Sequence, residues 1–311
     1  MKLIIQIPCF NEEETLPVTL KDLPREIPGI DKVEWLIIND GSRDRTVEVA
    51  KACGVDHIVS FTKNRGLAEG FRKGLDACLS LGADIIVNTD ADNQYDASCI
   101  PDLVEPIISG KADIVVGARP IADIDDFSFI KKKLQKLGSK VMRTISGTNV
   151  QDAPSGFRAF SREAAMRLNV YSEYTYTLET IIQAGAKNLN IVNVPIKTNG
   201  MTRPSRLFKS MTSYIRRSIK TMIWVRIIYK PFPFFFNKGL LSFIAGAILG
   251  LRYLVFMFSG DGGGHTQSLI LSSILILFGA TMMLVAFLAD LLAVNRKLLE
   301  DIKYNQLKER K

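Results

Sequence analysis

The sequence contains few of the residues that bind transition metals or form disulfides. Its 311 residues include four cysteines and two histidines, and no two cysteines form a CxxC pair. Cys9, Cys53, Cys78 and Cys99 are widely spaced, and all of them precede the long apolar segments of the chain. A structural zinc site needs closely spaced Cys and His ligands, and a disulfide framework needs regularly paired cysteines. The sequence therefore predicts neither.

Acidic residues are absent from a long stretch in the second half of the chain. No Asp or Glu lies between Glu179 and Asp261, whereas residues 196–238 contain ten Lys and Arg. Such a basic stretch beside apolar segments favours contact with anionic lipid headgroups or a phosphate. No helix-turn-helix, zinc-finger or aromatic single-strand-binding pattern accompanies it, so we do not expect nucleic acid as a partner.

Two long apolar runs argue against a purely soluble protein. Residues 240–259 and 269–289 form runs of 20 and 21 residues whose only formal charge is Arg252. At about 1.5 Å per residue, each run is long enough to cross a hydrocarbon core about 30 Å thick. We therefore predict a hairpin of two transmembrane helices within residues 238–296.

Basic residues flank this hairpin on one side. Lys230, Lys238, Arg296 and Lys297 lie just outside the two runs, whereas the turn between the runs has no Lys or Arg. Positive charge is retained on the cytoplasmic side, so we expect both termini and the whole first part of the chain in the cytoplasm. The N-terminal apolar run is too short for a signal peptide. The prediction is a multi-pass protein of the cytoplasmic (inner) membrane.

Residues 207–237 are predicted to lie at the membrane surface. Apolar residues recur there at spacings of three and four, with basic residues on the other face, which is typical of an interfacial amphipathic helix. A helix docked on the soluble domain is the alternative. The aromatic and proline-rich residues 231–238 are interpreted as a hinge. The roles of Arg252 and Asp290 stay open, and residues 297–311 are interpreted as a solvated cytoplasmic tail.

Residues 1–206 show the pattern of an α/β domain with a mainly parallel sheet. Apolar, β-branched runs alternate there with segments of helical length. The runs span residues 3–8, 34–40, 57–61, 83–90 and 113–119. Polar residues follow these runs at Asn11, Asp40, Asp90 and Arg119. Open α/β sheets bind ligands at the carboxyl ends of their strands, so we expect the functional site there.

The segment NTDADNQYD at residues 88–96 predicts a metal site. Asp90 and Asp92 stand two residues apart directly after a buried strand, and Gln94 offers a third oxygen. Mg²⁺ or Mn²⁺ takes oxygen ligands and completes its shell with water and substrate phosphates. Paired carboxylates in an ordinary turn are the alternative interpretation.

Seven motifs together resemble a known family. IPCFNEE, INDGSRDRT, NRGLAEGFRKGL and DADNQ follow one another in the first hundred residues, and VVGAR, DAPSGFRAF and PSRL come later. In this order they resemble family 2 glycosyltransferases of the GT-A fold, and with the hairpin they are similar to the polyprenyl-phosphate glycosyltransferases around dolichol-phosphate mannose synthase. The resemblance implies inverting transfer of a sugar from a UDP- or GDP-sugar to undecaprenyl or dolichyl phosphate at the cytoplasmic face of a lipid bilayer.

The resemblance also implies roles for individual residues. The nucleotide would be bound by Pro8, Asn11, Glu12, Asp40 and Asp90, and the Mg²⁺ or Mn²⁺ ion by Asp90, Asp92 and Gln94. The catalytic residues would be Asp90, Asp92, Arg119, Asp152 and Arg158. The acceptor phosphate would be bound by Lys132, Lys133, Ser155, Arg203, Ser205 and Arg206. The family pattern has an arginine near Thr202, and whether Arg203 replaces it stays open.

The implied chemistry agrees with the residue types present. A phosphate monoester has a second pKa of about 6, so it is anionic at neutral pH and needs no general base. A metal ion and an arginine stabilise the leaving diphosphate. Two alternatives remain: another membrane glycosyltransferase for polysaccharide or glycolipid synthesis, and a non-catalytic nucleotide-sugar-binding scaffold. The sequence leaves the sugar, the nucleotide and a homo-oligomeric state open.

Overall fold

The computed structural model describes residues 1–120, 129–172, 175–200, 211–260 and 266–309. Its internal contacts divide the chain into two units. The first unit, called the catalytic unit below, comprises Met1–Ile223 and Ile302–Lys311, and the second, called the hairpin unit, comprises Trp224–Asp301.

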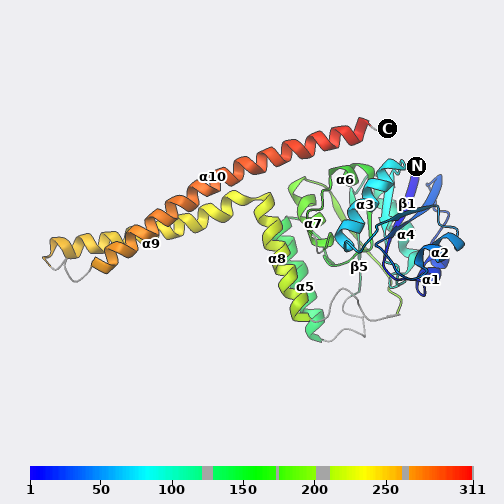
Figure 1. The fold of residues 1–311 in the computed structure, drawn as a ribbon, viewed down its shortest axis with the longest axis horizontal. Coiled ribbons are helices and arrows are strands. Elements are labelled where there is room, and N and C mark those ends of the chain that lie inside the picture. Colours follow the sequence, from blue (N-terminus) through cyan, green and yellow to red (C-terminus); the bar gives the residue numbers. More distant parts are fainter. Residues whose placement is uncertain (121–128, 173–174, 201–210, 261–265, 310–311) are drawn as a thin grey trace. The chain divides into compact units, whose positions relative to one another are not determined.

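A seven-stranded sheet forms the centre of the catalytic unit (Figure 1). Its strands are β1 (Lys2–Cys9), β2 (Lys32–Asn39), β3 (His57–Ser60), β4 (Ile85–Asn88), β5 (Ile114–Ala118), β6 (Arg158–Ser161) and β7 (Ile191–Pro195). The spatial order is β3-β2-β1-β4-β6-β5-β7. Strand β6 runs antiparallel to β4 and β5, and the other pairs are parallel. The predicted α/β domain with a mainly parallel sheet is confirmed.

Helices cover both faces of this sheet. Successive side chains of β1 point to opposite faces, so those on each face pack against helices. Leu3, Ile5 and Ile7 join one core cluster with residues of α1 (Leu16–Asp22), α2 (Thr46–Ala52) and α4 (Ile100–Ile108). Gln6 points the other way and meets Gly74 of α3 (Leu67–Ser80). Helix α6 (Arg162–Arg167) packs beside α3, and α5 (Phe129–Ser146) packs against α7 (Thr177–Ala186).

The chain bends at a single residue between α8 and α9. Helix α8 (Met211–Tyr229) ends before Lys230, whose φ of −141° and ψ of 69° are not helical, and α9 (Pro231–Phe258) starts directly after it. The expected hinge at residues 231–238 is therefore helical. Pro231 and Pro233 fit there because the first turn of a helix needs no N–H donors for internal hydrogen bonds.

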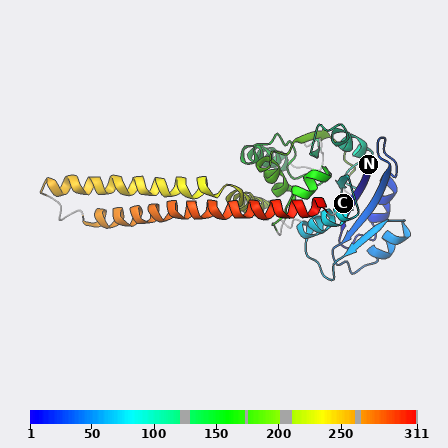
Figure 2. The ribbon, with the colours of Figure 1, turned by 90° about the horizontal axis from the view of Figure 1, so that it is seen from above.

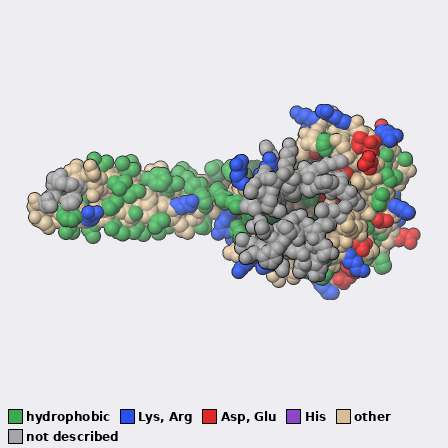
Figure 3. Space-filling view, turned by 90° about the horizontal axis from the view of Figure 1, so that it is seen from below, with side chains coloured by type: hydrophobic (Ala, Val, Ile, Leu, Met, Phe, Trp, Pro, Cys, Tyr) green, Lys and Arg blue, Asp and Glu red, His purple; other side chains and the backbone are tan. Residues whose placement is uncertain are grey.

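Two helices of the hairpin unit are long and apolar enough to span a membrane, namely α9 and α10 (Thr266–Glu309). They lie side by side in two views (Figures 1 and 2), and hydrophobic side chains cover much of their surface (Figure 3). Small residues allow the close packing, because a Cβ added to Gly246 would lie 2.9 Å from the backbone of Ser272 and Ile276. The Ser272 hydroxyl also donates to the Gly246 carbonyl over 2.7 Å.

Helix α10 buries one residue in every seven, at Ser272, Gly279, Ala286, Ala293 and Glu300. A seven-residue repeat keeps one face of a helix against its partner over a long distance. The helix extends well beyond the predicted run of 269–289 and includes most of the segment that was expected to be a tail. Arg252 lies on the exposed surface of α9, with its guanidinium 5.5 Å from the centre of the Phe256 ring.

Candidate nucleotide-sugar site

Three of the predicted motifs follow neighbouring parallel strands. Strand β1 pairs in parallel with β2 on one side and with β4 on the other. Their carboxyl ends therefore meet at one edge of the sheet, where the loops starting at Phe10, Asp40 and Thr89 emerge. The structure thus brings together the predicted nucleotide and metal residues.

The first two loops are tied to each other by hydrogen bonds. The Asn11 N–H donates to Ser42 Oγ over 3.0 Å, and Asn11 Oδ1 accepts from the Arg43 N–H over 2.8 Å. The Glu12 N–H donates to Thr46 Oγ1 over 2.8 Å. Asn11 has a φ of 55°, a left-handed conformation that asparagine tolerates better than most residues. Pro8, near the end of β1, lies opposite Ile38 of β2.

Asp40 anchors the segment that precedes helix α3. Its Oδ1 accepts from the Arg65 N–H over 2.7 Å, and its Oδ2 accepts from the Gly66 N–H over 2.9 Å. The adjacent Gly41 has a φ of 71°, and an added Cβ would lie 2.6 Å from the Lys63 carbonyl carbon. Asp40 is buried, so its carboxylate fixes the turn before α3 and retains lone pairs for a further donor.

The loop after β4 carries the predicted metal residues. Asp90, Asp92 and Gln94 are half-buried, and Asp92 Oδ1 accepts from the Gln94 N–H over 3.3 Å. Between them, Asn93 has a φ of 54°. No group of three or more His, Cys, Asp or Glu side chains suited to a metal occurs in the described part of the chain. Two carboxylates and an amide suit a hard cation that takes its other ligands from water and phosphate.

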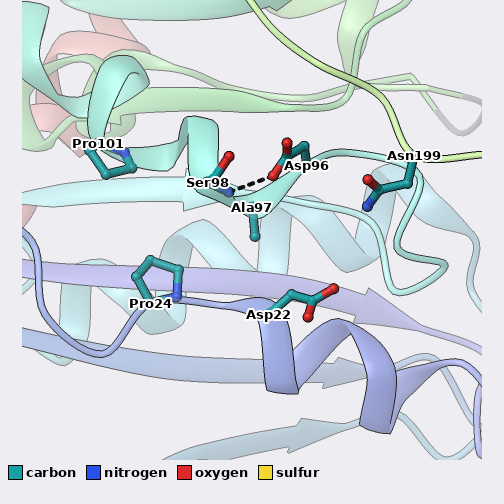
Figure 4. Close-up of a pocket in the computed structure, with 7 residues that line it drawn as sticks. All are labelled: Asp22, Pro24, Asp96, Ala97, Ser98, Pro101 and Asn199. Atoms are coloured by element: carbon teal, nitrogen blue, oxygen red, sulfur yellow. Dashed lines mark hydrogen bonds between the residues drawn. The ribbon is translucent and has the colours of Figure 1, made fainter.

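A cavity of about 330 Å³ borders this loop (Figure 4). It is lined by Asp22, Pro24, Asp96, Ala97, Ser98, Pro101 and Asn199. Two lining residues hold Asn93 in place, because Asp22 Oδ2 accepts from Asn93 Nδ2 over 2.8 Å and Asn199 Nδ2 donates to the Asn93 carbonyl over 2.9 Å. These contacts support the left-handed turn between Asp92 and Gln94.

Gly156 lies directly against Asp90, the first of the predicted metal residues. A Cβ added to Gly156 would lie 3.4 Å from Asp90 Oδ2 and 3.1 Å from the Tyr176 hydroxyl. The Gly156 N–H donates to the Tyr95 hydroxyl over 3.1 Å, and its carbonyl accepts from the Tyr176 hydroxyl over 3.2 Å and from Asn88 Nδ2 over 3.0 Å. Two buried tyrosines therefore hold the loop of residues 152–157 next to the metal loop.

Burial raises the pKa of both tyrosine hydroxyls. It raises the pKa of Tyr95 to about 12 and the pKa of Tyr176 well above its ordinary value, and the negative charge of Asp90 adds to both shifts. Both phenols are therefore protonated at neutral pH, and the Tyr176 hydroxyl donates to the Gly156 carbonyl whereas the Tyr95 hydroxyl accepts from the Gly156 N–H.

Arg119 and Asp152 form a bidentate ion pair. Arg119 Nε lies 2.7 Å from Asp152 Oδ2, and Arg119 Nη2 lies 3.0 Å from Oδ1. The Asp152 side chain is 1% exposed and the Arg119 side chain 14%. A planar fork held at two atoms has a fixed orientation. Asp152, which was predicted to be catalytic, therefore orients Arg119 in this structure.

Arg158 is fully buried, which differs from the exposure expected of a residue that contacts substrate. Its guanidinium donates to the carbonyls of Ala153, Ser155 and Thr177 over 2.7 to 2.9 Å and to Thr180 Oγ1 over 2.8 Å. Burial lowers the pKa of Arg158 to about 10, so it stays protonated at neutral pH. Arg158 shapes the loop from within.

Ser155 presents a buried hydroxyl that lacks a protein partner. Its Oγ is inaccessible and has no hydrogen-bond partner among the described residues. A buried hydroxyl without a partner costs free energy, and such groups in native structures commonly serve a ligand or water. The neighbouring Gly156 lies against Asp90, which places the backbone at Ser155 beside the loop that carries the predicted metal residues.

Some predicted residues are not placed at the site by the structure. Arg203, Ser205 and Arg206 lie outside the described residues, and of Lys132 and Lys133 only their place on α5 is described. Conversely, Tyr95, Tyr176 and Asn88 were missed. Tyr95 directly follows the DADNQ motif and could have been noticed there, whereas nothing in the sequence connects Tyr176 to it.

The chain is similar in sequence to known proteins. Residues 4–168 match the family model for Glycosyl transferase family 2. The chain is 32% identical over 217 residues to the UDP-N-acetylglucosamine–dolichyl-phosphate N-acetylglucosaminyltransferase of Methanococcus voltae, covering 62% of this chain and 83% of that protein. It is 27% identical over 206 residues to the undecaprenyl-phosphate mannosyltransferase of Micrococcus luteus, covering 63% and 83%.

A similar fold is found among solved structures. Glucosyl-3-phosphoglycerate synthase from Mycobacterium tuberculosis, crystallised with Mn²⁺, UDP and glucosyl-3-phosphoglycerate, aligns with a TM-score of 0.53 at 21% identity. The alignment covers 73% of this chain and 78% of that one. At this identity the likeness shows the fold alone, which is the GT-A-like α/β fold that the sequence motifs implied.

Proposed function

The chain belongs to glycosyl transferase family 2, and from this premise we propose that it transfers a sugar from a nucleotide-sugar to a polyprenyl phosphate, with inversion at the anomeric carbon. The observation that carries the proposal is the contact of the Ser155–Gly156 loop with the metal loop at Asp90. The same loop carries Asp152, which orients Arg119, and a guanidinium suits a phosphate next to a metal-bound diphosphate. The dolichyl- and undecaprenyl-phosphate acceptors in the names of its relatives support this acceptor class.

On the donor side, the loops after β1, β2 and β4 would bind the nucleotide diphosphate. Pro8, Asn11, Glu12 and Asp40 would contact the nucleoside, since Asp40 can accept a hydrogen bond from a base N–H. Asp90, Asp92 and Gln94 would hold a divalent ion, Mg²⁺ or Mn²⁺. When bound, the ion would neutralise charge on the leaving diphosphate.

On the acceptor side, the lipid phosphate itself would be the nucleophile. One of its oxygens forms a bond to the anomeric carbon while the bond from that carbon to the diphosphate breaks. No proton has to be removed, because the phosphate is anionic at neutral pH with its second pKa at about 6. Ser155 is fully buried in this structure, so its proposed contact with the phosphate rests on the sequence motifs alone. Arg119, oriented by Asp152 and 14% exposed, would lower the repulsion between the two anions.

The roles of the remaining predicted residues follow from their positions. Arg158 acts as a positioning residue, because all four of its hydrogen bonds go to the protein and it is fully buried. Lys132, Lys133, Arg203, Ser205 and Arg206 remain proposed acceptor-phosphate residues on the strength of the sequence motifs. Their basic side chains suit an anionic lipid.

The hairpin unit would hold the enzyme in the membrane. We propose that α9 and α10 span the bilayer and that both termini and the catalytic site face the cytoplasm, because the flanks are basic and the turn is not. The exposed face of α8 suits the interface, since Ile219 and Ile223 are each 49% exposed beside Arg216 and Lys220.

The test is an acceptor-dependence assay. Detergent-purified full chain is incubated with Mg²⁺ or Mn²⁺ and a panel of UDP- and GDP-sugars, with and without undecaprenyl phosphate, and nucleoside diphosphate release is measured. We expect release from one donor that requires the lipid phosphate. Release that ignores the lipid would instead support an acceptor of another class, and no release with any donor would contradict the proposed activity.

A further inference from the structure

The C-terminal end of α10 is bonded to the catalytic unit. The Tyr304 hydroxyl donates to the carboxylate of Glu163 on α6, with oxygen distances of 2.9 and 2.8 Å. Lys303 Nζ donates to Asn169 Oδ1 over 2.9 Å. All four residues lie in the catalytic unit, which includes Ile302–Lys311. The segment that was expected to be a solvated tail is therefore docked.

One face of α10 makes this contact. Lys303, Tyr304 and Leu307 are half-buried, whereas Asn305 and Gln306 are exposed. These three residues lie three, four and seven positions after Glu300, the last residue of the buried repeat, and therefore on the same side of α10. The helix thus uses a continuous side along its length, first for packing in the hairpin and then for docking.

The α6 side of the contact is fixed by its own hydrogen bonds. Arg167 Nε donates to Glu163 Oε1 over 2.7 Å, and its guanidinium lies 5.1 Å from the centre of the Tyr304 ring. The Asn169 N–H donates to Gln183 Oε1 of α7 over 2.8 Å, and Asn169 is buried. Glu163 and Asn169 therefore receive Tyr304 and Lys303 without having to be ordered first.

Helix α10 also makes a second covalent route between the two units. It runs unbroken from Thr266 to Glu309 and passes from one unit to the other at Asp301, whereas the first route passes between the units at Ile223, within α8. A domain attached to another at one point samples more orientations than a domain attached at two. Such a restriction raises the effective concentration of the catalytic site at an acceptor phosphate in the membrane.

We propose that the contact of Tyr304 and Lys303 with α6 is an intramolecular anchor that orients the catalytic unit for an acceptor confined to the bilayer. The inference rests on the proposed function, because it concerns use of a lipid phosphate. Tyr304, Lys303, Glu163 and Asn169 are positioning residues in this account. The anchor serves the membrane-embedded acceptor and has no part in donor binding or chemistry.

The experiment compares two acceptors with anchor variants of the full chain. Y304F removes the hydroxyl that donates the hydrogen bond, and E163Q removes the negative charge of the side chain that accepts it. N305A, at the exposed neighbouring residue, is the matched control. Each is assayed with undecaprenyl phosphate in liposomes and with a short-chain, water-soluble polyprenyl phosphate. We expect the KM for the embedded acceptor to rise about fivefold in Y304F and E163Q and no further in the double variant, because the two changes break one contact. Donor KM and short-chain rates stay unchanged.

Two readouts separate the anchor from general stability and from the proposed function. Hydrogen exchange of the α6 amides is expected to speed up in Y304F without a change elsewhere in the sheet. An unchanged KM for the embedded acceptor, or an equal loss with both acceptors, would overturn the anchor. If the wild-type chain makes no lipid-linked sugar at all, the proposed function fails and the orienting role with it, while exchange still reports whether the contact forms.

Discussion

Asp92 is the residue whose replacement tests the metal assignment. D92N keeps the size of the side chain and removes the charge, so we expect Mn²⁺ affinity of the full chain to fall at least about tenfold and turnover by about 10² or more. Affinity is measured by electron paramagnetic resonance of Mn²⁺ titrated into the protein, with and without nucleoside diphosphate.

A control for Asp92 lies in the same loop. Asp96 accepts a hydrogen bond from the Ser98 N–H over 2.9 Å and is outside the proposed metal set. D96N is therefore expected to leave Mn²⁺ affinity unchanged. Equal affinities in D92N and the wild type would contradict the assignment of the metal to this loop.

Glu34 determines part of the acid stability of the sheet. Burial alone would raise its pKa, but hydrogen bonds from Lys2, Lys32 and His57 outweigh this and lower the pKa from 4.5 to about 2. The lowered pKa corresponds to at most about 3 kcal/mol of stability. This contribution is complete above pH 4.5 and disappears as the pH falls towards 2.

E34Q removes this pH-dependent term. We expect E34Q to be less stable than the wild type at pH 6, with the difference shrinking as the pH is lowered through the range from 4.5 to 2. Chemical unfolding of both proteins in detergent, followed across this range, measures the difference. A difference that is constant with pH would show that the Glu34 charge does not contribute as described.

At the scale of elements, helix α3 approaches the sheet as closely as a glycine permits. A Cβ on Gly74 would lie 2.4 Å from Gln6 Oε1 and 3.0 Å from Ile38 Cδ1. G74A gains about 1 kcal/mol of helix propensity but overpacks the core by about 1 to 3 kcal/mol. We expect a net loss of about 1 kcal/mol and a lower midpoint in thermal unfolding.

Gly138 provides the matched control for α3. It is also in a helix, α5, and no described atom lies within 4 Å of the position of an added Cβ. G138A should therefore be neutral or slightly stabilising, by up to about 1 kcal/mol. A stable G74A protein would show that Gln6 and Ile38 move aside easily.

The elements were predictable where one local pattern determines them. The β-branched runs identified β1, β2, β4 and β5, because strands buried on both faces are apolar along their whole length. The antiparallel direction of β6 was not predictable, since it depends on how the loop before Arg158 returns to the sheet. The helical start of α9 was missed because its prolines and aromatics were interpreted as a hinge.

The same limit applies to the site. The spacing of Asp90, Asp92 and Gln94 and their place after an apolar run predict a metal site, and their role as ligands stays a prediction. The contacts of Gly156 with Tyr95 and Tyr176 could not be predicted, because the partners lie 61 and 20 residues away along the chain. Side chains that act through tertiary contacts leave no local signal.

At the scale of the whole molecule, the charge and the apolar runs predicted a cytoplasmic domain followed by a membrane hairpin. The structure has two compact units, Met1–Ile223 with Ile302–Lys311 and Trp224–Asp301, whereas the membrane topology stays a prediction. Tyr304 and its partner Glu163 are 141 residues apart, and no local pattern connects them. A charged end is usually solvated, and only the structure identifies the docked face.

The central claim is that the chain forms a bond between a sugar and a lipid phosphate. The most direct measurement is ³¹P NMR and mass spectrometry of the lipid recovered after the full chain, in liposomes with Mn²⁺, has consumed a nucleotide-sugar. We expect the phosphate monoester to become a phosphodiester carrying one sugar, and D92N to prevent the change. Lipid recovered as the unaltered monoester while the donor is consumed would contradict it.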